Sequence, residues 1–170
     1  MKFEHLVQIN DPKLFGANWL SREQVWFGLV ARAWKPARFV MGLESADILQ
    51  SSQEGNVTTL TRRLNYGSFQ IEDRIALHEH ERTETHIAAN PYCGESTMTI
   101  RIEEPEQGQL WLRFEYRIED TAEQATAPSL GVDINEVRKQ AYRAADIDTV
   151  KMIRELANTL PQASQDRKDH

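Results

Sequence analysis

The chain has only one cysteine among its 170 residues, Cys93. A single thiol excludes an internal disulfide framework and is typical of a reducing compartment. Cys93 lies in a turn-like stretch, residues 90–94, with no neighbouring His or Asn pattern that would activate it. We therefore expect an ordinary loop thiol in a cytoplasmic protein.

Long apolar runs and an excess of positive charge are also missing. No apolar stretch approaches the ~20 residues that a membrane span requires, and we recognise no signal peptide ahead of the first expected strand. The formal net charge is −6, whereas a nucleic-acid-binding surface would carry a basic stripe. We expect neither membrane insertion nor nucleic-acid binding.

The sequence contains no repeats, low-complexity tracts or long internal linkers. A chain of this length buries about 70% of its unfolded surface, which is enough for a real core. We therefore expect a single domain over residues 1–160, followed by a flexible polar tail at residues 161–170.

The N-terminal third predicts one strand and two helices. Residues 2–10 alternate, and one face carries His5 together with apolar Phe3, Val7 and Ile9. Ser21 and Gln24 form a capping-box pattern ahead of a helix whose apolar positions are Val25, Trp26, Leu29, Val30 and Ala33. Pro36 ends this helix, and residues 36–40 could form a second, short one.

About six strands and one long helix follow. The helix is expected over residues 133–160, with its inward stripe formed by Val137, Ala141, Ala145, Thr149, Met152 and Leu156. One-sided antiparallel strands need a cover for their apolar face, and this helix can supply it. The expected class is α+β, with one curved sheet gripping a helix.

Residues 57–77 predict a β-hairpin that places charge on its apolar face. Gly67 and Ser68 form a two-residue turn between two alternating runs. In this register Arg62 lies opposite Asp73, between the apolar pairs Tyr66–Phe69, Leu64–Ile71 and Leu60–Ile75. A charge facing a core is costly unless it is paired, so this face is expected to border a cavity.

A second hairpin is expected over residues 95–119, around Pro105 and Gly108. Its best register sets Met98, Ile100 and Ile102 opposite Phe114, Leu112 and Leu110, in that order. Tyr116 then shares the inward face.

The element order and several specific words resemble the AtaL-like family of the START and birch-pollen-allergen superfamily, the helix-grip proteins. The matching words are LSREQVWFGLVARAWKPARF, LTRRLNYG, IEDRIAL, TIRIEEPEQGQLWLRFEY and AYRAADIDTVKMIREL, which together cover almost the whole chain. The resemblance implies a seven-stranded antiparallel sheet wrapped around the C-terminal helix, with two short helices after the first strand and a hydrophobic cavity. The superfamily includes lipid carriers, hormone receptors and polyketide aromatases or cyclases. In LTRRLNYG, Arg63 stands where the resemblance to the family leads us to expect an acidic residue. The alternation of side chains along the strand points Arg63 outward, away from the cavity.

The candidate ligand-binding residues combine polar anchors with apolar walls: Arg62, Asp73, Tyr116, His5, Tyr142, Leu60, Leu64, Ile71, Leu112 and Phe114. Arg62 could hold a carboxylate or polarise a carbonyl, with Asp73 orienting it. The alternative is a closed structural ion pair. Similarly, His5 could transfer protons to and from a ligand, or it could be an ordinary hydrogen-bonded core histidine. The Tyr116 hydroxyl could donate a hydrogen bond to a ligand, or it could form one with a neighbouring residue. Tyr142 and Asp146 stand one turn apart and could supply polar contacts from the helical wall of the pocket. Asp146 could instead be a surface acid or an internal structural partner.

Three functions remain open. The first is a binding protein for a hydrophobic small molecule, lipid- or polyketide-like, with one polar end. The second is an enzyme of the polyketide cyclase or aromatase type that uses the same cavity, with His5 or Tyr116 handling protons. The third is an interaction protein that forms a homodimer through an exposed strand edge. We expect no cofactor and no metal, because the His78–His80 pair lacks a third ligand at a distinctive spacing.

Overall fold

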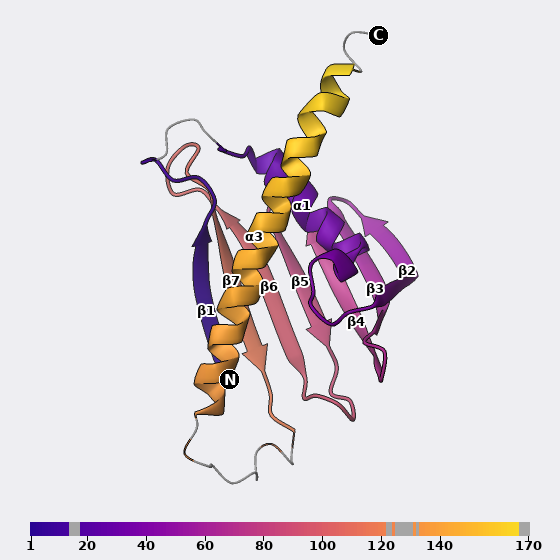
Figure 1. Cartoon of the computed structure of the whole chain (residues 1–170). Helices are drawn as coiled ribbons and strands as arrows, with labels where there is room; N and C mark the ends of the chain where they lie inside the picture. Colours follow the sequence, from indigo (N-terminus) through magenta and orange to yellow (C-terminus); the bar gives the residue numbers. More distant parts are fainter. Residues whose placement is uncertain (14–17, 122–123, 125–130, 132, 167–170) are drawn as a thin grey trace.

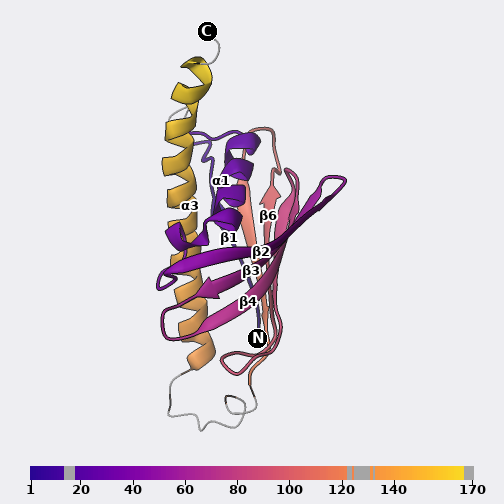
Figure 2. The same ribbon diagram turned by 90° about the vertical axis from the view of Figure 1, so that its right-hand side faces the viewer.

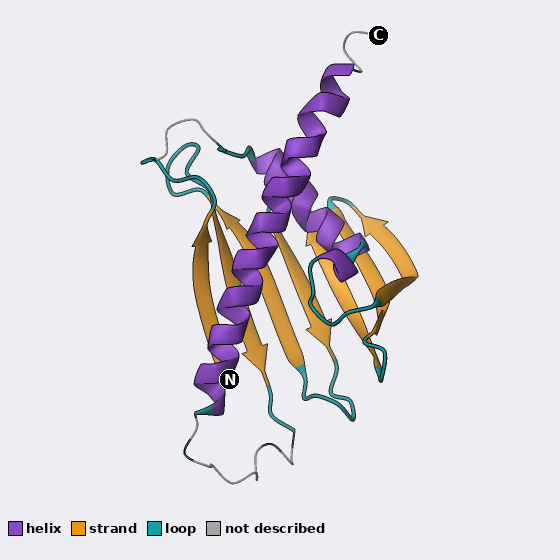
Figure 3. Cartoon of the chain, in the orientation of Figure 1, coloured by secondary structure: helices purple, strands orange, loops and turns teal. Residues whose placement is uncertain are grey.

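A curved antiparallel sheet of seven strands holds the helices on one of its faces (Figures 1 and 3). The computed structural model describes residues 1–13, 18–121, 124, 131 and 133–166, with side chains as far as residue 159. The sheet order is β1-β7-β6-β5-β4-β3-β2. The strands are β1 (Lys2–Gln8), β2 (Ser45–Glu54), β3 (Val57–Asn65), β4 (Gln70–His78), β5 (Arg82–Ile87), β6 (Ser96–Glu103) and β7 (Trp111–Ile118).

In the described part of the chain, the helical elements that accompany the sheet are α1 (Arg22–Trp34), the short 3-10 helix η1 (Pro36–Arg38) and α3 (Ile134–Asp166). Figure 2 shows α1 and α3 on the same face, with β2, β3 and β4 curving towards them. The expected helix-grip architecture is confirmed. None of the helices in the described part of the chain is long and apolar enough to cross a membrane.

The start and end of α1 follow the sequence pattern. The Ser21 hydroxyl accepts a hydrogen bond from the Gln24 amide at 3.1 Å, and the Gln24 side chain accepts one from the Ser21 amide at 2.8 Å. These bonds satisfy two of the amides that a helix start leaves without partners. Pro36 follows the last residues of α1 and opens η1.

The register of the β3–β4 hairpin is confirmed, whereas that of the β6–β7 hairpin is wrong by two residues. Arg62 pairs with Asp73, as expected. In the second hairpin Ile100 pairs with Phe114 and Ile102 with Leu112, not with the partners predicted above. A shift of two residues leaves every side chain on its expected face, so alternation alone cannot detect it.

The inward stripe of α3 also differs from the prediction. Of the predicted stripe, Thr149 is buried and Met152 and Leu156 are half-buried, but its first three residues, Val137, Ala141 and Ala145, are exposed. The other buried residues of the helix lie outside that stripe: Asp146, Val150, Ile153 and Ala157. The predicted stripe favoured apolar residues, but this helix turns a carboxylate inward because β1 and β7 supply hydrogen-bond partners for it. The helix extends to Asp166, beyond Leu160 where we expected it to end. Residues 167–170 of the predicted tail lie outside the described residues.

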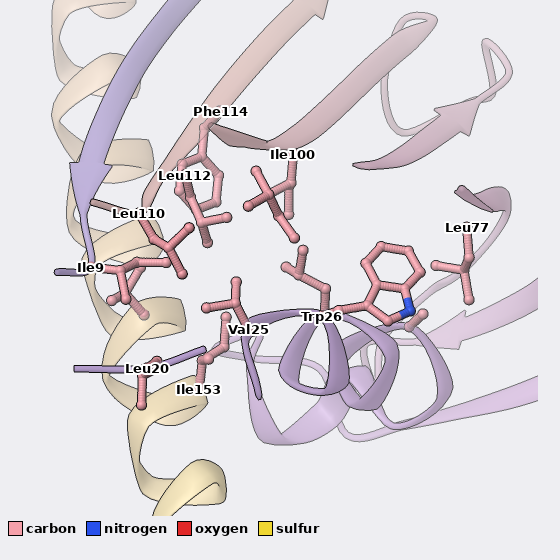
Figure 4. Packing of buried hydrophobic residues seen from close by; sticks show 14 of the residues in the cluster. Ile9, Leu20, Val25, Trp26, Leu77, Ile100, Leu110, Leu112, Phe114 and Ile153 are labelled. Atoms are coloured by element: carbon pink, nitrogen blue, oxygen red, sulfur yellow. The ribbon is translucent and has the colours of Figure 1, made fainter. Parts of the chain in front are cut away.

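The core lies where α1 crosses between α3 and the sheet. Figure 4 shows Val25 and Ile153 facing Ile9 and Leu110 at this crossing. Buried Asn10 closes the same end, because its amide donates to the carbonyls of Leu20 and Gly108 at 2.8 and 2.6 Å. This end of the fold is therefore sealed by apolar packing and by satisfied polar groups.

Gly28 allows α1 to approach α3 closely. A Cβ atom at this position would lie 2.7 and 2.8 Å from two side-chain carbons of Ile153. We expect Gly28→Ala to destabilise the protein by about 1–2 kcal/mol, because overpacking outweighs the gain of about 1 kcal/mol in helix propensity. Urea unfolding measures the effect. Gly28→Ala combined with Ile153→Ala should show strong coupling, and purely additive effects would contradict this explanation.

Candidate functional site

The inner face of the sheet is sealed at one end and half-open at the other. At the sealed end, Leu77, Thr83, Ile102 and Leu110 are no more than 5% exposed. At the opposite end, the inward-facing side chains on β1, β4, β5, β6, β7 and α3 are only half-buried: Phe3, Ile71, Thr85, Ile87, Met98, Ile118 and Tyr142. We call this second group the half-open end. Solvent therefore reaches this end of the inner face.

Arg62 and Asp73 form a buried, two-pronged ion pair beneath the half-open end. Nε and Nη2 of Arg62 donate to the two carboxylate oxygens of Asp73 at 2.9 and 2.5 Å. Nη1 of Arg62 donates to the carbonyl of Ala33 at 2.7 Å, so the guanidinium also caps the last turn of α1. The sequence pattern correctly predicted that Arg62 and Asp73 pair. Its geometry is that of a closed structural pair that joins β3, β4 and α1.

A second polar cluster joins β1, β7 and α3. Asp146 is 2% exposed and accepts hydrogen bonds from the Tyr116 hydroxyl at 2.7 and 2.8 Å. The second Asp146 oxygen also lies 2.6 Å from Nε2 of His5. Aromatic rings enclose the cluster, because His5 stacks between Phe3 and Phe114 at centroid distances of 5.3 and 5.4 Å.

Burial controls the electrostatics of this cluster. Burial raises the pKa of the Asp146 carboxyl, opposed by its hydrogen bonds with Tyr116 and His5. Burial and the nearby Asp146 also raise the pKa of the Tyr116 hydroxyl well above its usual range, so Tyr116 acts as a donor and not as a base. Nδ1 of His5 makes no hydrogen bond with any described residue.

Aromatic residues rim the half-open end. Tyr66 stacks on Phe69 at 5.1 Å, and Phe69 stacks on Tyr92 at 4.8 Å. On the opposite side, Tyr142 of α3 stacks on Tyr116 at 4.5 Å. Flat rings at such a rim suit an apolar ligand.

Arg32 on α1 was missed in the sequence. It is half-buried and its Nη2 lies 3.9 Å from the sulfur of Met98. Its Nε is buried without a hydrogen-bond partner among the described residues. The helical spacing of the sequence could have identified Arg32 as an inward-facing residue. It lies seven residues after Val25 and three after Leu29, on the stripe that faces the sheet. The inward-charge argument used for Arg62 applies equally to Arg32.

The predicted apolar walls divide into two groups. Leu60, Leu64, Leu112 and Phe114 are at most 5% exposed and belong to the closed core. Ile71 is half-buried at the half-open end. Any ligand at that end would therefore contact Ile71 directly and rest above the other four.

A separate hollow of about 540 Å³ lies on the outer face of the sheet, away from both helices. Its lining includes Phe3 and Tyr116, and its other members are outward polar residues of β1, β6 and β7: Lys2, Glu4, Thr97, Thr99, Glu115 and Arg117. The polar part of this lining mixes both signs of charge. This hollow is a second possible location for a ligand, and an experiment must distinguish it from the half-open end.

A family profile matches almost the whole chain. The family described as acetylaranotin biosynthesis cluster protein L, abbreviated AtaL, matches residues 4–159. No curated protein is similar enough in sequence to match this chain.

Solved structures share the fold at low sequence identity. The di-domain aromatase/cyclase StfQ from the steffimycin biosynthetic pathway has a TM-score of 0.64 and 8% identity, over 93% of this chain and 51% of that one. The ZhuI aromatase/cyclase from Streptomyces sp. R1128 has a TM-score of 0.55 and 11% identity, over 93% of each chain. A START superfamily protein from Mycobacterium smegmatis has a TM-score of 0.54 and 12% identity, over 94% and 98%. This chain thus spans about half the length of StfQ and nearly all of the other two.

Proposed function

The chain belongs to the AtaL family, and on that premise we propose that it binds an apolar small molecule with one polar end between the sheet and α3. The family membership bears out the resemblance inferred from the sequence. The names of the neighbours, among them aromatase/cyclases and a START superfamily protein, support a role in holding lipid- or polyketide-like molecules. Shared fold does not fix chemistry, so the proposal rests on the site itself.

The observation that carries the proposal is the half-open end. Its apolar inner residues stay partly accessible to solvent although a helix lies beside them, and aromatic rings surround them. Polar groups lie directly beneath, on α1, β1, β7 and α3. An apolar surface with a few convergent polar groups is typical of small-molecule sites. The ligand would contact Ile71, Met98 and Tyr142, with His5 and Tyr116 below it and the Arg62–Asp73 pair forming the floor.

A matched pair of tryptophan variants tests this location. Met98 faces inward and is half-buried, whereas Thr99, the next residue of β6, lines the outer hollow. We expect pyrenebutanol, a fluorescent apolar alcohol, to bind the wild-type protein and Thr99→Trp equally well. Met98→Trp should reduce its affinity at least about tenfold, because the added ring fills the accessible space.

Fluorescence titration measures these affinities, and circular dichroism with thermal unfolding checks that both variants are folded. Loss of binding in Thr99→Trp with retention in Met98→Trp would move the site to the outer hollow. Absence of binding to the wild-type protein would overturn the proposed function.

The second candidate, a cyclase-like enzyme, is favoured by the His5–Asp146–Tyr116 cluster. Asp146 fixes the imidazole through Nε2. Nδ1 would take a proton from an activated methylene, the resulting carbanion would form a carbon–carbon bond with a second carbonyl of the substrate, and the imidazolium would return the proton to the alkoxide. Aldol-type ring closure needs such a base.

If this enzyme reading is correct, His5→Phe should abolish turnover of a synthetic poly-β-ketone thioester while leaving pyrenebutanol affinity within about threefold, since the ring stack is kept. Product analysis by liquid chromatography and mass spectrometry measures turnover. Equal turnover by the wild-type protein and His5→Phe would contradict the hypothesis of a cyclase-like enzyme. It would not affect the hypothesis of a binding protein.

A further inference from the structure

Arg32 is a cation on the inner face that has no anionic partner in the described part of the chain. The Arg62 guanidinium donates to both oxygens of Asp73, whereas no Asp or Glu side chain pairs with Arg32. Among the described residues, its one side-chain hydrogen bond is the weak one to the Met98 sulfur, at 3.9 Å. Its Nε proton is therefore buried without an acceptor, which is a costly state for a charged group.

The surroundings of Arg32 place it at the centre of the polar floor. Arg32 directly precedes Ala33, whose carbonyl accepts a hydrogen bond from Arg62. Nη2 of Arg32 lies against Met98, which is paired with Tyr116 across β6 and β7. Tyr66, which rims the half-open end, also lies within electrostatic reach of Arg32. Arg32 thus occupies the interval between the two polar clusters, below the aromatic rim.

Among the described residues, neither polar cluster forms a hydrogen bond or an ion pair with Arg32. Asp73 is engaged by Arg62, and both oxygens of Asp146 accept hydrogen bonds from Tyr116. Because arginine stays protonated in proteins, the positive charge persists. A planar guanidinium with free N–H groups fits a carboxylate or a similar oxyanion in two-pronged geometry.

From these contacts we infer that Arg32 binds the anionic end of the ligand, so that the preferred ligand is an apolar carboxylic acid. This inference rests on the proposed function and specifies its ligand class. The apolar body of the acid lies against Met98 and the aromatic rim, and its carboxylate receives the Nε and Nη protons that the described part of the chain leaves unused.

Two probes that differ only in their end group test the inference. Pyrenebutanoic acid and pyrenebutanol share the same apolar body. We expect the wild-type protein to bind the acid more tightly than the alcohol. Arg32→Leu should weaken binding of the acid about 10- to 100-fold, the loss expected for a charge-assisted pair, and change affinity for the alcohol less than about threefold. Arg38→Leu, which removes an exposed arginine from η1, is the matched control and should change neither affinity.

Stability supplies a second readout. Since the Arg32 Nε is buried without a hydrogen-bond partner among the described residues, Arg32→Leu should keep or raise the melting temperature of the ligand-free protein. A lowered melting temperature together with equal loss of both probes would assign Arg32 a structural role and overturn the inference. Unchanged affinity for the acid would overturn it as well. Failure of the wild-type protein to bind even the alcohol would instead count against the proposed function.

Discussion

Arg62→Met is expected to destabilise the folded protein by about 3–5 kcal/mol. The substitution leaves the Asp73 carboxylate buried without its counter-ion, and it also removes the donor to the Ala33 carbonyl at the end of α1. The side chains of Arg62 and Asp73 are 4% and 1% exposed, so water cannot replace the lost partners without opening the fold. Urea unfolding followed by circular dichroism measures the loss.

The neighbouring pair on the same two strands supplies the control. Arg63 and Glu72 lie next to the buried pair but face outward, with side chains 41% and 62% exposed and 3.6 Å between charged atoms. Arg63→Met should change stability by less than about 1 kcal/mol. The double variant Arg62→Met with Asp73→Leu should recover much of the stability, since an apolar pair needs no counter-ion. If Arg62→Met proves as mild as Arg63→Met, the closed ion pair is not a structural element.

Asp146→Ala is expected to cost about 2–4 kcal/mol, because buried Tyr116 and half-buried His5 lose an acceptor that carries charge. Part of the loss is offset, since the variant no longer buries a carboxylate. Asp148→Ala, on an exposed side of the same helix, should stay within about 0.5 kcal/mol of the wild-type protein. Comparable losses in both variants would show that helix propensity, and not the cluster, determines the effect.

The raised pKa of Asp146 gives this cluster a pH dependence of known sign. Burial raises the folded-state pKa above the ordinary value of 3.8, so the folded protein binds this proton more tightly than the unfolded chain does. The resulting contribution to stability is fully present when the pH is below the ordinary pKa of the carboxyl, and it is lost as the pH rises through the folded-state pKa.

Asp146→Asn keeps the hydrogen-bonding shape without the titration. We therefore expect the wild-type protein to gain stability relative to Asp146→Asn as pH falls from neutral into this window. Denaturant unfolding at a series of pH values measures the difference. A difference that stays constant, or that shrinks on acidification, would contradict the assignment of a buried, titrating Asp146.

How far the sequence predicts the fold depends on the kind of pattern. The β3–β4 register was predictable because the turn at Gly67 and Ser68 and the pairing of Arg62 with Asp73 select the same alignment. The β6–β7 register was not, because its loop fixes no unique turn and a two-residue shift preserves the faces.

The candidate site was predictable where local charge patterns reveal it and not where distant strands complete it. The inward stripe of α3 was misread because Asp146 is buried by virtue of a hydroxyl on β7 and an imidazole on β1, partners far away in the sequence. Arg32 was missed for a different reason, since polar residues on a helix are ordinarily solvated. Only its spacing from Val25 and Leu29 indicates that it turns inward.

Native mass spectrometry tests the central claim, a small-molecule site at the half-open end, most directly. The wild-type protein and the Met98→Trp and Thr99→Trp variants would each be equilibrated with a lipid extract of the expression host, and the bound masses would then be released. We predict one apolar molecule of the same mass on the wild-type protein and on Thr99→Trp, and none on Met98→Trp. Identical bound masses on all three proteins, or no adduct on any of them, would contradict binding between the sheet and α3.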